Sequence, residues 1–206
     1  MNARLCLVLP VLMAGCVSVL PEPVVPEGLY RLTSISRQMP EGGEIFLPGS
    51  VMINPPQGSD LLLGRSIVFE EPNGALKLLA SAEWSDQMAR QLQGALIDRL
   101  MFSAAEDSGA VLSDRFGAGG DYELQWEVRD MVIRDTEAVI QLRGTLSRFQ
   151  NGKSQSFNIQ LREPYVGMSD DAGVQALIDV ARKAIDELAT TVPELMNRPG
   201  MLPEDS

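Results

Sequence analysis

The sequence of 206 residues contains no histidine, only two cysteines and few aromatic residues, which make up 5% of the chain. Without histidine, Ser-His-Asp and Cys-His catalysis, histidine-ligated zinc and a histidine pH switch are all excluded. The two cysteines, Cys6 and Cys16, are too few for a four-thiolate metal site or a disulfide framework. We therefore expect no metal, no cofactor and no catalytic residue, and the composition argues against an enzyme.

Basic residues are also scarce. The chain has 17 Lys and Arg against 28 Asp and Glu, a formal net charge of −11, and this balance argues against nucleic-acid binding. Apolar residues make up 45% of the chain, which is enough to fill one core, and the length favours a single domain.

The first 15 residues have the organisation of a secretory signal. A short basic head, Met1 to Arg4, precedes an apolar run from Leu5 to Met13, and the small residues Ala14 and Gly15 follow. As a helix this run is about 14 Å long, roughly half of a bilayer core, so it cannot span a membrane. We interpret residues 1–15 as a cleaved signal peptide.

The end of this segment, Leu12-Met13-Ala14-Gly15-Cys16, resembles the bacterial lipobox, whose commonest form is Leu-Ala-Gly-Cys. The resemblance implies cleavage after Gly15, a diacylglyceryl thioether on Cys16 and an acylated amino terminus. Two or more acyl chains hold a protein stably on a membrane, whereas one does not. Met13 departs from the usual Leu. The remaining alternative is a plain secretory signal with an incidental cysteine.

Proline-rich segments border the central block on both sides. Residues 16–28 contain Pro21, Pro23 and Pro26 and have no helical periodicity, so we expect an extended tether. Residues 193–206 form a proline-rich, acidic tail. The block between them, residues 29–192, has no internal repeat and no convincing linker.

Period-2 and period-3.6 patterns predict an α+β domain in which two main amphipathic helices pack on one face of a mixed or antiparallel sheet. Strands are predicted near residues 29–35, 51–54, 66–69 and 76–79, and three more between residues 122 and 161, with a bulge near Asp130. Pro72-Asn73-Gly74 and Asn151-Gly152 are predicted turns.

Two helices complete the pattern. We expect the first to start at Trp84, capped by Ser81 or Ser85, with Gly109 beyond its end. The second is expected to start after Ser169 and to end at Pro193. Its predicted buried stripe comprises Val174, Leu177, Ile178, Ala181, Ile185, Leu188 and Val192.

A search for catalytic motifs finds almost nothing. Gly117 to Gly120 is glycine-rich but precedes a strand, so it does not match a dinucleotide-binding loop, and no Ser-x-x-Lys occurs. The acid pairs Glu70/Glu71, Glu106/Asp107 and Asp170/Asp171 are sequence neighbours and should diverge. A carboxylate-dependent hydrolase built from distant acids stays open as an alternative.

Three apolar features need an interpretation. Trp84 and Trp126 are interpreted as core residues. Leu61 to Leu63 cannot all face one core if the segment is extended, so they either form a buried strand or expose one side to a partner or lipid. The exposed sides of the two helices are the other candidate partner surfaces.

These patterns together resemble the ABC-type transport auxiliary lipoprotein family, which includes paraquat-inducible protein C. The resemblance is carried by the lipobox, the proline tether, Tyr30-x-Leu32, Leu62-x-Gly64, the strands at 66–69 and 76–79, Trp84 with Leu92, Leu96 and Leu100, Tyr122-x-Leu124 and the closing helix from about Ser169 to Val192. One departure is Phe69-Glu70, where members often have Tyr-Arg.

The resemblance implies a non-catalytic, periplasm-facing lipoprotein that works with an MCE-domain protein and ABC transporter subunits to move lipids between membranes. Val17 follows Cys16, and because it is not Asp, the sorting pattern of enteric bacteria favours the outer membrane of a Gram-negative cell. Self-association stays open. The alternative is an envelope assembly factor or activator that binds another envelope enzyme or an outer-membrane protein.

Overall fold

The computed structural model describes residues 26–32, 44–114, 119–167 and 169–202. Cys16, the predicted signal peptide and most of the predicted tether therefore lie outside the described residues, and so do residues 203–206 of the tail.

The centre of the fold is an antiparallel meander of three long strands, β6 (Tyr122–Ile133), β7 (Glu137–Arg148) and β8 (Ser154–Pro164). The turn between β7 and β8 contains Gly152 with φ of 66°, a left-handed conformation that glycine adopts without strain. This is the hairpin that Asn151-Gly152 predicted. The predicted bulge is also confirmed, because the β6–β7 register shifts between Val128 and Asp130.

Short strands extend the sheet beyond β6, so that eight strands of the described chain form one mixed sheet. The start of β6 pairs with β2 (Val51–Ile53), and β2 pairs with β5 (Val111–Ser113), both in parallel. The end of β6 meets β3 (Ser66–Glu70), which pairs with β4 (Leu76–Trp84). β1 (Gly28–Tyr30) lies parallel to the end of β4.

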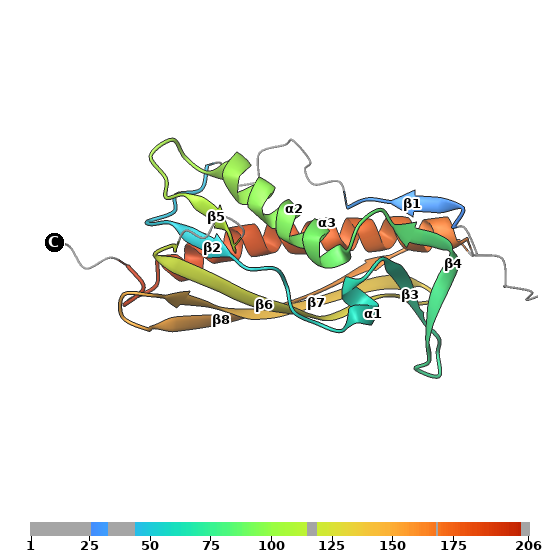
Figure 1. Ribbon diagram of the computed structural model, residues 1–206. Coiled ribbons are helices and arrows are strands. Elements are labelled where there is room, and N and C mark those ends of the chain that lie inside the picture. Colours follow the sequence, from blue (N-terminus) through green and yellow to red (C-terminus); the bar gives the residue numbers. More distant parts are fainter. Residues whose placement is uncertain (1–25, 33–43, 115–118, 168, 203–206) are drawn as a thin grey trace, which may run out of the picture.

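Two helices, α2 (Met88–Ser103) and α3 (Asp170–Met196), cover one face of this sheet, and the short α1 (Asp60–Leu63) lies near β3 (Figure 1). α3 begins as predicted, since the Ser169 side chain accepts a hydrogen bond from the Ala172 amide. Every residue of its predicted stripe is buried. The predicted α+β class, a single domain with helices on one sheet face, is confirmed.

The start of the first helix differs from the prediction. Trp84 is the last residue of β4, and α2 starts only at Met88 with Gln87 at its N-cap and no side-chain cap bond. The Trp84 amide donates to the Arg65 carbonyl at 2.7 Å, and the Ser85 amide donates to the Tyr30 carbonyl at 2.7 Å. These bonds to distant segments hold the backbone extended. The Trp84 side chain is nevertheless buried, as predicted.

The end of the second helix also differs. Pro193 lies inside α3, which continues to Met196. Proline removes one backbone hydrogen bond of a helix. The last turn still forms because Leu195 and Met196 are buried and because the Asn197 amide and side chain both donate to the Pro193 carbonyl.

Candidate functional site

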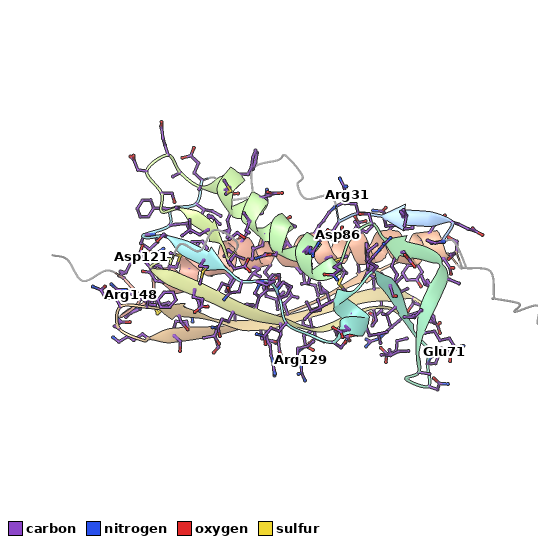
Figure 2. The ribbon with its side chains drawn as sticks, viewed as in Figure 1. Arg31, Glu71, Asp86, Asp121, Arg129 and Arg148 are labelled. Carbon is purple, nitrogen blue, oxygen red and sulfur yellow. The ribbon has the colours of Figure 1, made fainter. Side chains whose placement is uncertain are left out.

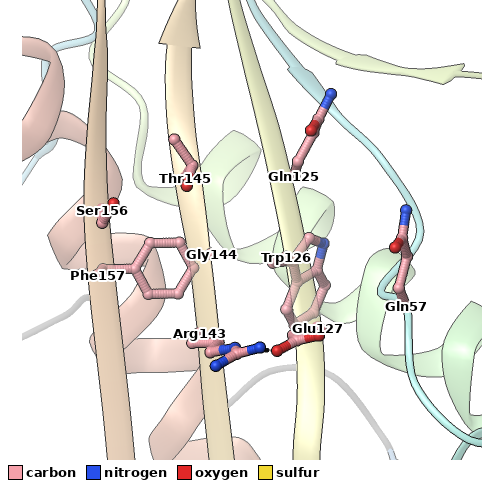
Figure 3. A pocket seen from close by; sticks show the side chains of 9 residues that line it. All are labelled: Gln57, Gln125, Trp126, Glu127, Arg143, Gly144, Thr145, Ser156 and Phe157. Carbon is pink, nitrogen blue, oxygen red and sulfur yellow. Dashed lines mark hydrogen bonds and ion pairs between the residues drawn. The ribbon is translucent and has the colours of Figure 1, made fainter.

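The sheet face opposite the helices is polar. Across β6, β7 and β8, the register aligns Gln125, Thr145 and Ser156 in one row and Glu127, Arg143 and Asn158 in another. Arg143 forms an ion pair with Glu127, and this pair closes one side of a shallow hollow (Figure 3).

This hollow has a volume of about 350 Å³ and lies around Gly144, between the two rows. A Cβ at Gly144 would come within 2.4 Å of the Gln125 carbonyl oxygen and 2.8 Å of the Phe157 ring, so only glycine fits. Amides and hydroxyls form most of its polar lining, and its one carboxylate, Glu127, is already paired. The hollow can therefore accept hydrogen bonds and donate them, but it offers no free carboxylate.

One grouping of acids lies around Arg134, in the β6–β7 turn. Its guanidinium lies 2.8 Å from Glu70, 3.3 Å from Asp130 and 3.6 Å from Glu137. Burial raises the pKa of Asp130 above its ordinary value, while the hydrogen bond from Arg134 to Glu70 raises the pKa of the arginine. One cation pairs with all three carboxylates, which come from β3, β6 and β7. We therefore interpret the cluster as stabilising the contact between these strands.

In two of the three acid pairs that the sequence offers, the two carboxylates bind different partners. Glu70 binds Arg134 while Glu71 binds Lys77. Asp170 accepts a hydrogen bond from the Ser81 hydroxyl at 2.6 Å, and Asp171 accepts one from the Tyr30 hydroxyl. Within the described residues, no group of three or more Cys, Asp and Glu side chains could hold a metal ion.

Exposed apolar side chains gather at the two ends of the molecule. We call the first group the aromatic end; it consists of Phe46, Met101, Phe102, Phe149 and Leu202. Phe46 and Phe149 are 56% and 57% exposed, and a group of large exposed apolar side chains is an informative feature of a surface. Figure 2 shows Asp121 and Arg148 at this end, far from Glu71.

Backbone hydrogen bonds hold the segments of the aromatic end together. The Ile45 amide donates to the Ser103 carbonyl at 2.6 Å, which places Phe46 beside the end of α2. The Phe149 amide donates to the Asp121 carbonyl at 3.0 Å. A hollow of about 520 Å³ adjoins Phe149; it is lined by Pro48, Gly120, Asp121, Tyr122, Arg148, Phe149 and Gln150.

We call the second group the hairpin end; it consists of Leu29 in β1, Leu76 and Leu78 in β4, and Val166 after β8. Leu78 is 54% exposed and Val166 98%. In Figure 1 the β3–β4 hairpin projects from the sheet at the end where β1 and the start of α3 lie.

The structure decides between the interpretations of the candidate residues. Leu61 to Leu63 belong to the helix α1 and not to a buried strand; one side packs against the core through Leu63, and the other is exposed at Leu61, which is 36% exposed. Trp84 and Trp126 are buried core residues, as predicted. The exposed phenylalanines were missed, because no periodicity marks them; their position in or beside loops was the only signal.

None of the helices in the described part of the chain combines the length and the apolar composition needed to cross a bilayer.

Comparisons with known proteins extend this description. The model of the family described as the ABC-type transport auxiliary lipoprotein component matches residues 30–192. A crystal structure of protein XCC0632 from Xanthomonas campestris aligns with a TM-score of 0.70 and 16% identity, covering 82% of this chain and 96% of that one. A second crystal structure, of an uncharacterized protein, aligns with a TM-score of 0.61 and 14% identity, covering 82% and 98%.

At these identities the structural likeness supports the fold alone, and no curated protein matches the sequence. The family match is stronger, because it spans nearly all of the domain and runs from β1 into the last turns of α3. The chain therefore belongs to the ABC-type transport auxiliary lipoprotein family.

Proposed function

We propose that this protein is a lipid-anchored, periplasm-facing and non-catalytic component of an ABC transport system, and that it docks an MCE-domain subunit that moves lipid between membranes. Family membership supports the auxiliary role. The lipobox ending at Cys16 supports the anchor, and Val17 after it favours the outer membrane. The acids around Arg134 are all held in ion pairs, which supports a role without catalysis.

The aromatic end carries the docking part of this proposal. Of the five phenylalanines in the described residues, three are exposed, and all three lie at this end; the other two, Phe69 and Phe157, pack against the core. Aromatic side chains are enriched in the buried centres of protein interfaces, where a few residues supply most of the affinity. We assign this end to the MCE-domain subunit.

The geometry of the chain suits this assignment. The tether enters β1 at the hairpin end, and α3 separates that end from the aromatic end with its 27 residues, about 40 Å. A domain anchored at one end would therefore present its phenylalanines away from the membrane, toward a partner that spans the envelope.

The test is capture of the MCE-domain subunit by the full-length acylated protein in detergent, comparing wild type with the double variant Phe46→Ser, Phe149→Ser. Loss of two interface anchors should weaken capture by roughly 30-fold. Leu61→Ser is the matched control, because it removes an exposed apolar side chain on α1, outside both ends, and should not change capture.

Equal capture by wild type and the double variant would contradict docking through the aromatic end. Recovery of a murein synthase or an outer-membrane barrel in place of an MCE subunit would favour the alternative role as an assembly factor. Thermal unfolding of each variant verifies that it is folded; because both phenylalanines are more than half exposed, we expect little loss of stability.

A further inference from the structure

The exposed apolar side chains of the hairpin end have no role in the docking proposed above, because that docking is assigned to the aromatic end. The residues of this apolar surface come from three separate segments: Leu29 from β1, Leu76 and Leu78 from β4, and Val166 from the loop before α3. Leu76 and Leu78 alternate with Lys77, so both leucines project from the same face of the hairpin.

Strand pairing and a hydrogen bond hold the hairpin part of this surface in place. The turn at the tip of the hairpin contains Gly74 with φ of 82°, and β3 and β4 stay paired up to Glu70 and Leu76. Where β4 passes the start of α3, the Ser81 hydroxyl donates to Asp170. A rigid apolar surface loses little conformational freedom when a partner covers it.

A hollow of about 300 Å³ lies behind the exposed leucines, on the face of β4 that is turned to the core. Phe69, Leu79, Ile133 and Tyr165 supply its apolar lining, and the Tyr165 hydroxyl is used internally, donating to the Arg134 carbonyl at 2.5 Å. The hollow is therefore separate from the surface that Leu76 and Leu78 form on the outer face of the hairpin.

The tether relates this end to the membrane. Residues 16–25 separate the predicted acylation site from the first described residue, and a fully extended stretch of that length spans at most about 36 Å. The tether enters β1 at the hairpin end, where the Tyr30 hydroxyl donates to Asp171 at the start of α3. Since α3 is about 40 Å long, the same tether holds the hairpin end closer to the lipids than the aromatic end.

We propose that the hairpin end lies against the lipid surface that holds the acyl chains of Cys16, with Leu76, Leu78 and Val166 in the interfacial region. This inference rests on the acylation in the proposed function. Burial of these side chains orients the domain, whereas the acyl chains supply the affinity.

Charge restricts the kind of lipid. Several acids border the hairpin end, and most of them are held by neighbours: Glu70 by Arg134, Glu71 by Lys77, and Asp170 by Ser81. Few of the described residues at this end are cations without an acidic partner, and the chain has a formal charge of −11, so anionic headgroups would repel this end. The surface fits a zwitterionic leaflet.

The experiment uses fluorescent labels on the acylated protein in vesicles of phosphatidylethanolamine and phosphatidylcholine. The described residues contain no cysteine and Cys16 would be alkylated, so Leu78→Cys and Met101→Cys each provide one thiol for an environment-sensitive dye. We expect the dye at 78 to shift to the blue and to be quenched by brominated acyl chains, while the dye at 101 behaves as it does in water.

The two proposals fail in different ways. If mass spectrometry finds Cys16 unmodified, or if the wild type does not float with vesicles, the anchor fails and this inference fails with it. If the protein floats but the dye at 78 stays as in water, or if both dyes are quenched equally, only the inference is overturned. An equal signal in vesicles rich in anionic lipid would overturn the proposed preference for zwitterionic headgroups.

Discussion

Asp121 shows how one side chain joins two strands at the aromatic end. Its carboxylate accepts hydrogen bonds from the Ser50 amide at 2.8 Å and from the Ser50 hydroxyl at 2.7 Å. The Asp121 amide in turn donates to the Ser50 hydroxyl at 3.0 Å. These bonds connect the starts of β2 and β6. They also hold the pKa of Asp121 below its ordinary value of 3.8.

A lowered pKa in the folded protein means that the ionised carboxylate stabilises the fold at pH values above 3.8, and that this contribution disappears as the pH falls through the lower folded value. We expect Asp121→Asn to lower the free energy of unfolding by about 1 kcal/mol at pH 7, and by less in strong acid. Urea unfolding at both pH values measures this difference.

Asp107→Asn, at an exposed loop position after α2, controls for the loss of one negative charge. A deficit of Asp121→Asn that stayed the same in strong acid would show that the bonds of the ionised carboxylate are not its cause.

Gly109 also acts at the scale of a single residue. The sequence predicts that it lies beyond the end of the first helix, and α2 does end before it, at Ser103. In the structure, a Cβ at Gly109 would lie 2.0 Å from the Gly49 carbonyl oxygen, so glycine is needed because two backbones pass in contact. A pattern search finds this glycine but cannot identify its partner.

At the scale of elements, the segment after α3 acts as a clasp on the meander. The Tyr122 hydroxyl donates to the Met201 carbonyl at 2.5 Å, the Asn151 side chain donates to the Gly200 carbonyl at 3.0 Å, and the Arg148 guanidinium donates to the Leu202 carbonyl. Arg148 and Met201 are both buried. The first residues of the predicted proline-rich tail therefore belong to α3, and the following residues, up to 202, contact the meander.

Deleting residues 197–206 should lower the free energy of unfolding by about 3–5 kcal/mol, because it exposes apolar core around Met201 and removes the acceptor carbonyls of a buried guanidinium and a buried phenol. Deleting only residues 203–206 is the matched control and should have no effect. Urea midpoints compare the two; equal midpoints would show that the clasp does not stabilise the domain.

At the scale of the whole molecule, its length and the tether together set the greatest distance that the aromatic end can reach when the domain leaves the lipid surface. Deleting residues 18–23 keeps the lipobox and Cys16, so anchoring should be unchanged. The deletion shortens by about 20 Å the greatest distance that the domain can move away from the lipid surface to dock, so we expect less cross-linking to the MCE-domain subunit in intact cells. A flexible Gly-Ser segment of equal length in place of residues 18–23 should restore it.

Membrane fractionation together with cross-linking yield checks this expectation. Unchanged cross-linking after the deletion would mean that reach does not limit docking. Failure of the Gly-Ser replacement to restore it would mean that the tether sequence itself is recognised.

Much of the fold could be predicted, because burial follows local periodicity. The alternation of Tyr122, Leu124, Trp126 and Val128 and the stripe of α3 each identify a core face, and all of these residues are buried. The candidate site could not be predicted in the same way. Phe46, Phe102 and Phe149 lie far apart in the chain, and a single sequence does not show that their segments meet with the rings outward.

The sequence by itself determined the α+β class, the helix start at Ser169, the Asn151-Gly152 turn and the faces turned to the core, since each depends on neighbours along the chain. Only the tertiary structure decided that Trp84 belongs to a strand, that α3 continues through Pro193 and that apolar side chains gather at two opposite ends. The physical reason is that backbone hydrogen bonds and burial from distant segments outweigh local propensity at these positions.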